Sequence, residues 1–204
     1  MFRLDWAVMD APKLILAQAL TQALNDLAAK ADGLSELDQR RPLTPTGTNL
    51  LGLMKHVASI TLGYLGGAFG RDPGIELPWF APDSEEDADF WVLPTESRRQ
   101  ILDLYAAAQE VAAATVAALD LDAPGVVPWW PPERRQVTLQ QIMVHLIAEI
   151  ARHAGHADIV RELIDGEVGR FPADPCVGHR TAADWVAHRA RLEEAAHTAT
   201  GPAA

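Results

Sequence analysis

The stretch HLIAEIARHAGH, from His145 to His156, is the part of the sequence that decides the fold. It places three imidazoles and one carboxylate inside an apolar segment, at His145, Glu149, His153 and His156. At about 100° per residue, these four side chains fall within an arc of roughly 80° on one face of a helix. Imidazole and carboxylate are the ligands that zinc and similar divalent metals prefer. The stretch therefore predicts a helix that carries part of a metal site.

The composition limits the kinds of protein that this chain can be. Its 204 residues are enough for one domain with a sizeable core. The formal net charge of −11 argues against nucleic-acid phosphates or an anionic membrane surface as the main partner. No apolar run approaches the roughly 20 residues that a membrane span needs. The single cysteine, Cys176, excludes an intrachain disulfide and a cysteine-based zinc site. We therefore expect a cytoplasmic globular protein.

Helical periodicity extends over most of the chain. Apolar residues recur at helical spacing in four long segments, at about residues 11–32, 49–66, 95–119 and 138–165. The last three segments begin with polar residues that cap helices: Thr48 or Asn49, Thr95 and Thr138. A further helix is predicted from Thr181 to about His197, and no segment shows a strong strand pattern. The pattern favours an all-α four-helix bundle with long loops and an extra C-terminal helix.

The strongest candidate ligands are Glu149 and His153, because side chains four residues apart on a helix converge. Alternatively, the two side chains only form a hydrogen bond with each other on a polar helix face. The strip lies beside Leu146 and Ile150, so part of it should face the core, where an unpaired carboxylate is costly. This position favours a metal site over a solvated face.

A third ligand has to come from another helix. His56 lies on the apolar face of the second long segment, between Leu53 and Ile60. It is either a buried histidine satisfied by a hydrogen bond or a metal ligand that points into the bundle. His145 and His156 are rival ligands, or they lie beside the ligands or in the wall of a substrate pocket.

Four motifs give the chain a family resemblance: PTGTNLLGLMKH (Pro45–His56), ADFW (Ala88–Trp91), PWW (Pro128–Trp130) and EIARHAGHAD (Glu149–Asp158). In their order and spacing they resemble the DinB-like superfamily over about residues 5–170. More narrowly, they resemble its actinobacterial branch of uncharacterised proteins, beside the mycothiol-dependent maleylpyruvate isomerases. On this basis residues 1–170 form the metal-binding domain. Residues 171–204 form an extension with one helix, packed on the same domain.

The resemblance implies an up-up-down-down four-helix bundle that holds a divalent metal and often forms a homodimer. The ligand pattern of the superfamily is one histidine on the second helix and a His- or Glu-x-x-x-His pair on the last bundle helix. Carried onto this sequence, the pattern gives His56, Glu149 and His153. The carboxylate variant matches the thiol-dependent isomerase branch.

The expected function is that of a metal-dependent S-transferase or isomerase that uses a low-molecular-weight thiol, such as mycothiol, on small electrophilic molecules. Zinc is the expected metal, and nickel, iron and manganese bind the same ligands. A metal-assisted hydrolase and a non-enzymatic metal- or ligand-binding bundle are the alternatives. No catalytic residue beyond the ligands can be assigned from the sequence.

Three further residues are candidates for the substrate pocket. Arg152, next to the ligand strip, either orients an anionic group of the substrate or forms a surface salt bridge. Trp129 and Trp130 either cover the mouth of the pocket or anchor their loop to the bundle.

Overall fold

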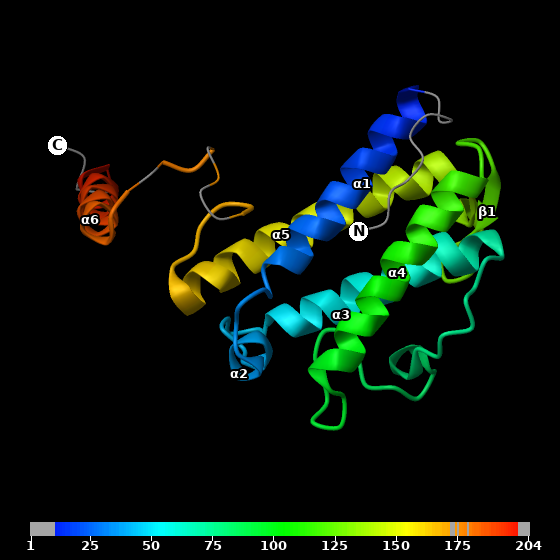
Figure 1. Cartoon of the computed structure of the whole chain (residues 1–204), viewed down its shortest axis with the longest axis horizontal. Helices are drawn as coiled ribbons and strands as arrows, with labels where there is room; N and C mark the ends of the chain where they lie inside the picture. The colour runs from blue at the N-terminus through cyan, green and yellow to red at the C-terminus, as the bar shows by residue number, and fades with distance from the viewer. Residues whose placement is uncertain (1–10, 172–173, 175, 179, 200–204) are drawn as a thin grey trace.

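The computed structural model describes residues 11–171, 174, 176–178 and 180–199, and these are mainly helical (Figure 1). The long helices are α1 (Ala11–Ala29), α3 (Leu50–Thr61), α4 (Arg98–Ala118), α5 (Leu139–Asp165) and α6 (Ala182–Ala199), and a short helix, α2 (Glu36–Arg40), precedes α3. Helix α1 packs along α5, and α3 packs along both α4 and α5. The mainly helical character predicted from the sequence is therefore confirmed.

Helix α3 lies at the centre of the packing. Every residue from Leu50 to Ser59 is buried. Apolar side chains of the neighbouring helices belong to the same core, among them Leu24, Leu27, Ile101, Tyr105, Leu146 and Ile150. A helix buried on all sides is expected to be apolar throughout, yet this one contains Lys55 and His56. Two ionisable side chains are therefore held in the core, where each needs a partner.

The ends of α3 follow from local chemistry. Asn49 caps the N-terminus, because its side-chain oxygen accepts a hydrogen bond of 2.8 Å from the backbone N–H of Gly52. After Thr61 the chain continues as a π-helical turn, η2 (Leu62–Gly66), and a 3₁₀ turn, η3 (Gly67–Phe69). Gly70 ends the run with a left-handed φ of 64°. The predicted end, near Gly66, lies beyond the end of α3 itself and coincides with the end of the π-helical turn η2.

The caps of the next two helices differ in how well the sequence predicted them. Thr138 begins α5 with a capping box in which its partner is Gln141, as expected. The expected cap of α4, Thr95, is wrong. Ser97 takes this role, because its hydroxyl and the side chain of Gln100 satisfy each other's backbone N–H groups.

One small sheet departs from the prediction that the chain lacks strands. Strand β1 (Pro124–Val126) pairs antiparallel with β2 (Gln136–Thr138). Each strand has three residues, which is too short to produce a recognisable alternation of polar and apolar residues in the sequence. The sheet closes the loop that carries Trp129 and Trp130.

Helix α6 forms where a C-terminal helix was predicted. The side-chain oxygens of Thr181 and Asp184 accept hydrogen bonds from each other's backbone N–H groups, which caps its start. None of the residues in α6 is buried, and Figure 1 shows it apart from the other helices. Contacts between α6 and the rest of the domain are not found among the described residues, so the expected packing of this extension stays a prediction.

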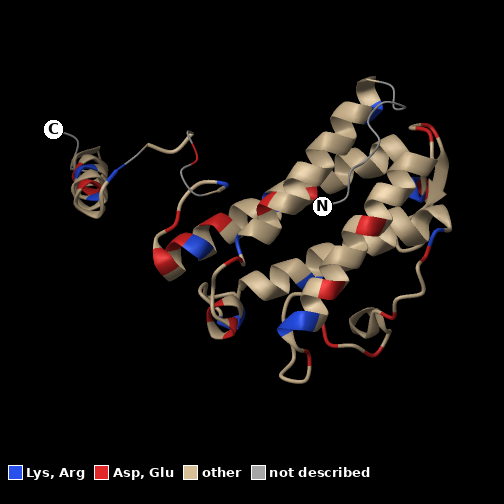
Figure 2. Ribbon diagram, in the orientation of Figure 1, with Lys and Arg blue, Asp and Glu red and all other residues tan. Residues whose placement is uncertain are grey.

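By length and composition, α4 is the one helix among the described residues that is apolar enough to cross a membrane. It packs along α3, and one of its faces is buried through Ile101, Tyr105 and Val116. Figure 2 shows acidic residues, in red, along the ribbon of this helix. These are the properties of a core helix, so its apolar composition is weak support for a membrane span.

The loop between α3 and α4 returns along α3. It contains a 3₁₀ turn, η4 (Pro78–Phe80), and approaches α3 most closely at Gly52. A Cβ atom at Gly52 would lie 1.8 Å from the carbonyl oxygen of Phe90. Only glycine therefore allows this backbone to lie against the helix.

We expect the substitution Gly52→Ala to lower the free energy of unfolding by about 1–3 kcal/mol, because the added methyl group displaces the Phe90 backbone. Chemical denaturation measures the change. Gly155→Ala is the matched control, because no atom lies within 4 Å of a Cβ built at this exposed position in α5. It should increase stability, by up to about 1 kcal/mol. Equal effects of the two substitutions would rule out the close contact.

Candidate metal centre

The structure brings together the side chains of His56, Glu149 and His153. His56 comes from α3, and the other two come from successive turns of α5. One ligand atom from each lies within 4.8 Å of the others. The Nε2 atom of His153 is 3.1 Å from Oε1 of Glu149, and Nε2 of His56 is 3.9 Å from the same oxygen. Ligands around a tetrahedral zinc ion lie about 3.3 Å apart, so one divalent ion fits this triangle with small side-chain movements.

Asp89 fixes the orientation of the His56 ring. Its Oδ2 atom lies 2.6 Å from Nδ1 of His56, and both residues are buried. A carboxylate at this distance accepts the Nδ1–H proton, which leaves the lone pair on Nε2. Carboxylates hold metal-binding histidines in this way in many proteins.

The Nε2 atom of His56 is buried and has no hydrogen-bond partner among the described residues. Buried polar atoms in folded proteins almost always have a partner. A histidine that only stabilises the core would have a hydrogen-bond partner for each of its two ring nitrogens. His56 has a partner for Nδ1 alone among the described residues. Its free nitrogen lies next to Glu149, so the donor set fits a bound cation better than a structural hydrogen bond.

Phe90 covers one side of the site. Its ring stacks on the His56 ring with centroids 3.9 Å apart and an interplanar angle of 19°. It also lies 5.7 Å from the ring of His153. An apolar ring in this place excludes water from one side of the imidazoles, which strengthens the electrostatic interactions of the site.

The two rival histidines of α5 lie on opposite sides of the cluster. His156 contacts His153, with their Nδ1 atoms 3.4 Å apart, and its side chain is exposed. His145 packs instead against the ring of Tyr64 at 4.9 Å. Neither residue belongs to the group of three whose ligand atoms converge. Of the two, His156 is the one in contact with a candidate ligand.

The paired tryptophans form an aromatic cluster with Tyr64. Trp130 donates a hydrogen bond of 2.9 Å to the Tyr64 hydroxyl, and Trp129 lies 3.5 Å from the same oxygen. Trp130 also packs 5.3 Å from the ring of His145. The cluster anchors the loop to η2 and α5, and Trp129 remains largely exposed. Arg152 is exposed and makes no side-chain contact with the described ligands.

Burial lowers the pKa of His153, and the nearby His56 lowers it further. Contact with Glu149 acts in the opposite direction but does not outweigh these effects. At neutral pH the imidazole is therefore uncharged, which is the form that binds metals.

The lowered pKa of His153 predicts a pH dependence of the metal-free protein. Because the folded pKa lies below the unfolded value of about 6.5, the folded protein binds fewer protons than the unfolded chain as the pH falls through this value. We therefore expect stability to decrease from about pH 7.5 to about pH 5 by more than in a His153→Gln variant. Thermal denaturation of both proteins at the two pH values measures the difference. An identical loss of stability in both proteins would show that His153 does not contribute to the pH dependence.

Sequence reasoning did not assign a role to Asp89 or Phe90. Both lie in the ADFW motif, which contributed only to the family resemblance. Helical periodicity cannot place a loop residue that is 33 positions from its histidine partner. The sequence feature that could have indicated Asp89 is its place between a small and an aromatic residue, Ala88 and Phe90, in an otherwise polar loop.

The fold and the site together define a mainly helical protein with a cluster of two histidines and a carboxylate that could hold a metal ion. The model of the mycothiol S-transferase family matches residues 15–166. This match covers most of the chain, which therefore belongs to the mycothiol S-transferase family. No curated protein matches the sequence.

Proposed function

We propose that the chain is a divalent-metal-dependent transferase that joins a low-molecular-weight thiol, with mycothiol as the expected one, to a small electrophilic molecule. The family match supports the thiol and the transfer. The convergence of His56, Glu149 and His153 supports the metal. The observation that carries the proposal is the buried Nε2 atom of His56, which has no hydrogen-bond partner in the described part of the chain and lies 3.9 Å from Glu149.

The charges around the site also support a cation. Asp89 and Glu149 bring two carboxylates to His56, at 2.6 Å and 3.9 Å. Among the described residues, neither carboxylate forms an ion pair with a lysine or an arginine. Partly buried carboxylates without compensation are costly. One divalent cation would balance both charges.

We also infer that α1, α3, α4 and α5 form the up-up-down-down four-helix bundle of the superfamily. The packing of α1 along α5 and of α3 along α4 supports this arrangement. The metal site would then lie between the second and the last bundle helices. We expect a cytoplasmic homodimer that acts on a small molecule. Nucleic acids and membranes are not expected partners, because the net charge is −11.

Each residue of the site has a chemical role in this proposal. Two imidazoles and one carboxylate would hold the ion and would leave room for an outside ligand, as in catalytic zinc sites. A bound divalent ion lowers the pKa of a coordinated thiol and so makes it nucleophilic at neutral pH. Asp89 keeps the proton of His56 on Nδ1. Phe90 shields the ring from water.

In the transfer reaction, the thiol sulfur forms a bond to the electrophilic carbon, and the bond between this carbon and its leaving group breaks. The thiol proton is released together with the leaving group. Zinc is the expected ion, and nickel, iron or manganese would bind the same ligands.

The proposal is tested with the zinc-loaded protein, mycothiol and a halogenated nitroaromatic compound, whose thioether product absorbs visible light. We expect turnover that requires both the thiol and the metal and that stops after treatment with a chelator. A protein without stoichiometric metal, or with equal rates before and after chelation, would overturn the proposal. Thiol-independent turnover of esters or amides would favour the hydrolase alternative. Tight binding of the aromatic compound without turnover would favour a ligand-binding protein.

A further inference from the structure

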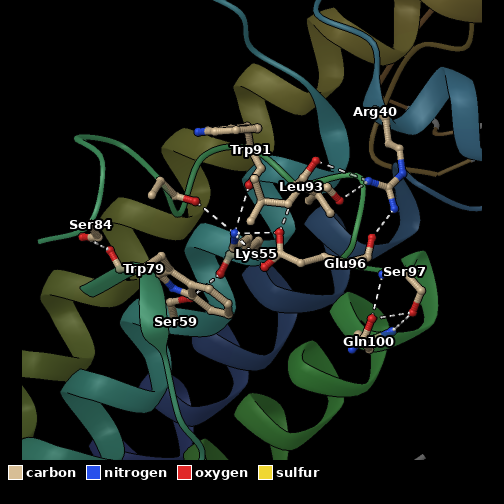
Figure 3. Close-up of polar contacts among 12 residues, drawn as sticks. Arg40, Lys55, Ser59, Trp79, Ser84, Trp91, Leu93, Glu96, Ser97 and Gln100 are labelled. Atoms are coloured by element: carbon tan, nitrogen blue, oxygen red, sulfur yellow. Dashed lines mark hydrogen bonds and ion pairs between the residues drawn. The ribbon is translucent and has the colours of Figure 1, made fainter. Parts of the chain in front are cut away.

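Lys55 is buried in the middle of α3, directly before His56, and its side chain points into the loop between α3 and α4 (Figure 3). Only 1% of its surface is exposed. Its ammonium nitrogen lies 3.0 Å from the Glu96 carboxylate, 2.9 Å from the carbonyl oxygen of Ala88 and 3.0 Å from that of Trp91. The three N–H donors of the ammonium group are thus matched by three acceptors.

Further contacts fix the partners of Lys55. The indole ring of Trp79 lies 4.1 Å from the ammonium nitrogen, in a cation–π contact. The Glu96 carboxylate also accepts a hydrogen bond of 2.7 Å from the backbone N–H of Leu93. Arg40 donates to the backbone oxygens of Leu93 and Glu96 (Figure 3). The ion pair is therefore part of a network that determines the path of the loop.

The backbone groups that Lys55 binds lie on either side of Asp89 and Phe90. The carbonyl oxygen of Phe90, between them, accepts a hydrogen bond of 3.3 Å from the side chain of Asn49. Three of the four carbonyl groups from Ala88 to Trp91 are thus bound to side chains of α3 or its cap. The Asp89 side chain, in the middle of this segment, is directed at Nδ1 of His56.

A buried lysine–glutamate pair is often no more stabilising than apolar residues of similar volume, because both charges lose their hydration. A methionine at this position would fill a similar volume at a lower desolvation cost. Methionine could not hold two backbone carbonyls, however, and the loop would lose its two contacts on either side of Asp89. The pair therefore provides specific positioning of the loop.

We propose that Lys55 is a positioning residue for the metal centre. Its ion pair with Glu96 holds the segment Ala88–Trp91 in place, so that Asp89 keeps the proton of His56 on Nδ1 and leaves Nε2 free for the metal. The part of this inference that concerns the metal rests on the proposed function. The part that concerns the His56 tautomer does not.

The inference is tested first without metal. Long-range ¹⁵N NMR spectra report which nitrogen of a histidine carries the proton, and the loss of signals in a His56→Ala variant assigns the residue. In the wild-type protein we expect His56 to be protonated on Nδ1 alone. In Lys55→Met we expect a mixture of the two tautomers. A pure Nδ1–H tautomer in Lys55→Met would overturn the inference, whatever the protein binds.

The second readout is zinc affinity, measured by competition with a chromophoric chelator. We expect Lys55→Met to weaken binding by roughly tenfold, within the range found for residues that orient metal ligands. Lys30→Met is the matched control. Lys30 is also a buried lysine, and among the described residues its ammonium group binds Asp158, at 2.8 Å, and the carbonyl oxygen of Gly169 rather than the segment Ala88–Trp91. Its loss should change the affinity by less than twofold.

A double-mutant cycle shows whether Lys55 acts through Asp89. In an Asp89→Ala background, Lys55→Met should weaken zinc binding by less than twofold, because the carboxylate it positions is absent. A full tenfold effect in this background would overturn the inference.

If Lys55→Met does not fold, Glu96→Gln replaces it in every measurement, because this substitution removes the charge of the partner with little change in shape. If the wild-type protein binds no zinc but Lys55→Met shifts the tautomer, the proposed function fails and the positioning role stands.

Discussion

Replacing His153 with alanine is expected to abolish stoichiometric metal binding while the helical content stays largely intact. His153 provides one of three converging ligand atoms, and Glu149 and His56 alone form an incomplete site. The imidazole forms its polar contacts with Glu149 and His156, and of the apolar side chains that pack against the core it meets the ring of Phe90, at 5.7 Å. Elemental analysis of the purified variant measures the metal, and far-ultraviolet circular dichroism measures the helical content.

Two other histidines serve as controls for this result. His188→Ala removes an exposed histidine of α6 and should leave one metal per chain. His145→Ala removes the histidine that packs against Tyr64 and Trp130, and it should also retain the metal. Unchanged metal content in His153→Ala would remove this residue from the site. Loss of metal in His145→Ala would instead move the site toward the aromatic cluster.

The second large effect is expected for Asp89. We predict that Asp89→Ala lowers zinc affinity by roughly 10- to 100-fold, because the His56 ring loses the carboxylate that fixes its tautomer and orientation. Competition with a chelator of known affinity measures the change. Asp83→Ala is the matched control, since Asp83 is an exposed acid of the same loop and should have no effect. Equal affinities of Asp89→Ala and the wild-type protein would exclude a role for Asp89 in metal binding.

The sequence predicted the helical part of the site because helices impose a fixed spacing. Glu149 and His153 lie on one face of α5 as their four-residue separation requires. His56 was placed on the buried face of its helix by the same periodicity, and the structure brings it to the other two. The long helices α3 and α5 were predicted for the same reason, together with the cap Thr138 and with Asn49 as one of two candidate caps beside Thr48.

The parts of the site that depend on loops could not be predicted in this way. Asp89 reaches His56 only because the loop between α3 and α4 folds back along the helix, and no periodic pattern encodes that path. Lys55 was assigned no role from the sequence, although it binds this loop. The error at Thr95 has a related cause. Its neighbour Glu96 pairs with Lys55 before the helix begins, and the capping box of Ser97 sets the actual start.

The buried polar residues of α3 have related tasks. Asn49 caps the helix and holds the carbonyl group of Phe90. Lys55 holds the carbonyls on either side of Asp89 and Phe90, and His56 binds the Asp89 carboxylate. Polar groups in a core persist when every one of them is satisfied. Among the described residues, two buried side-chain atoms of α3 lack a hydrogen-bond partner, Nε2 of His56 and Oγ1 of Thr61. Of the two, Nε2 of His56 is the one that lies beside the other candidate ligands.

The central claim is that a single divalent cation binds between His56, Glu149 and His153. The most direct measurement is an anomalous difference map, recorded at the zinc absorption edge from crystals grown with one equivalent of zinc. We predict one strong peak per chain at about 2.0–2.2 Å from Nε2 of His56, from a Glu149 oxygen and from a His153 ring nitrogen. A map without a peak at this position, or with its main peak at other residues, would contradict the claim.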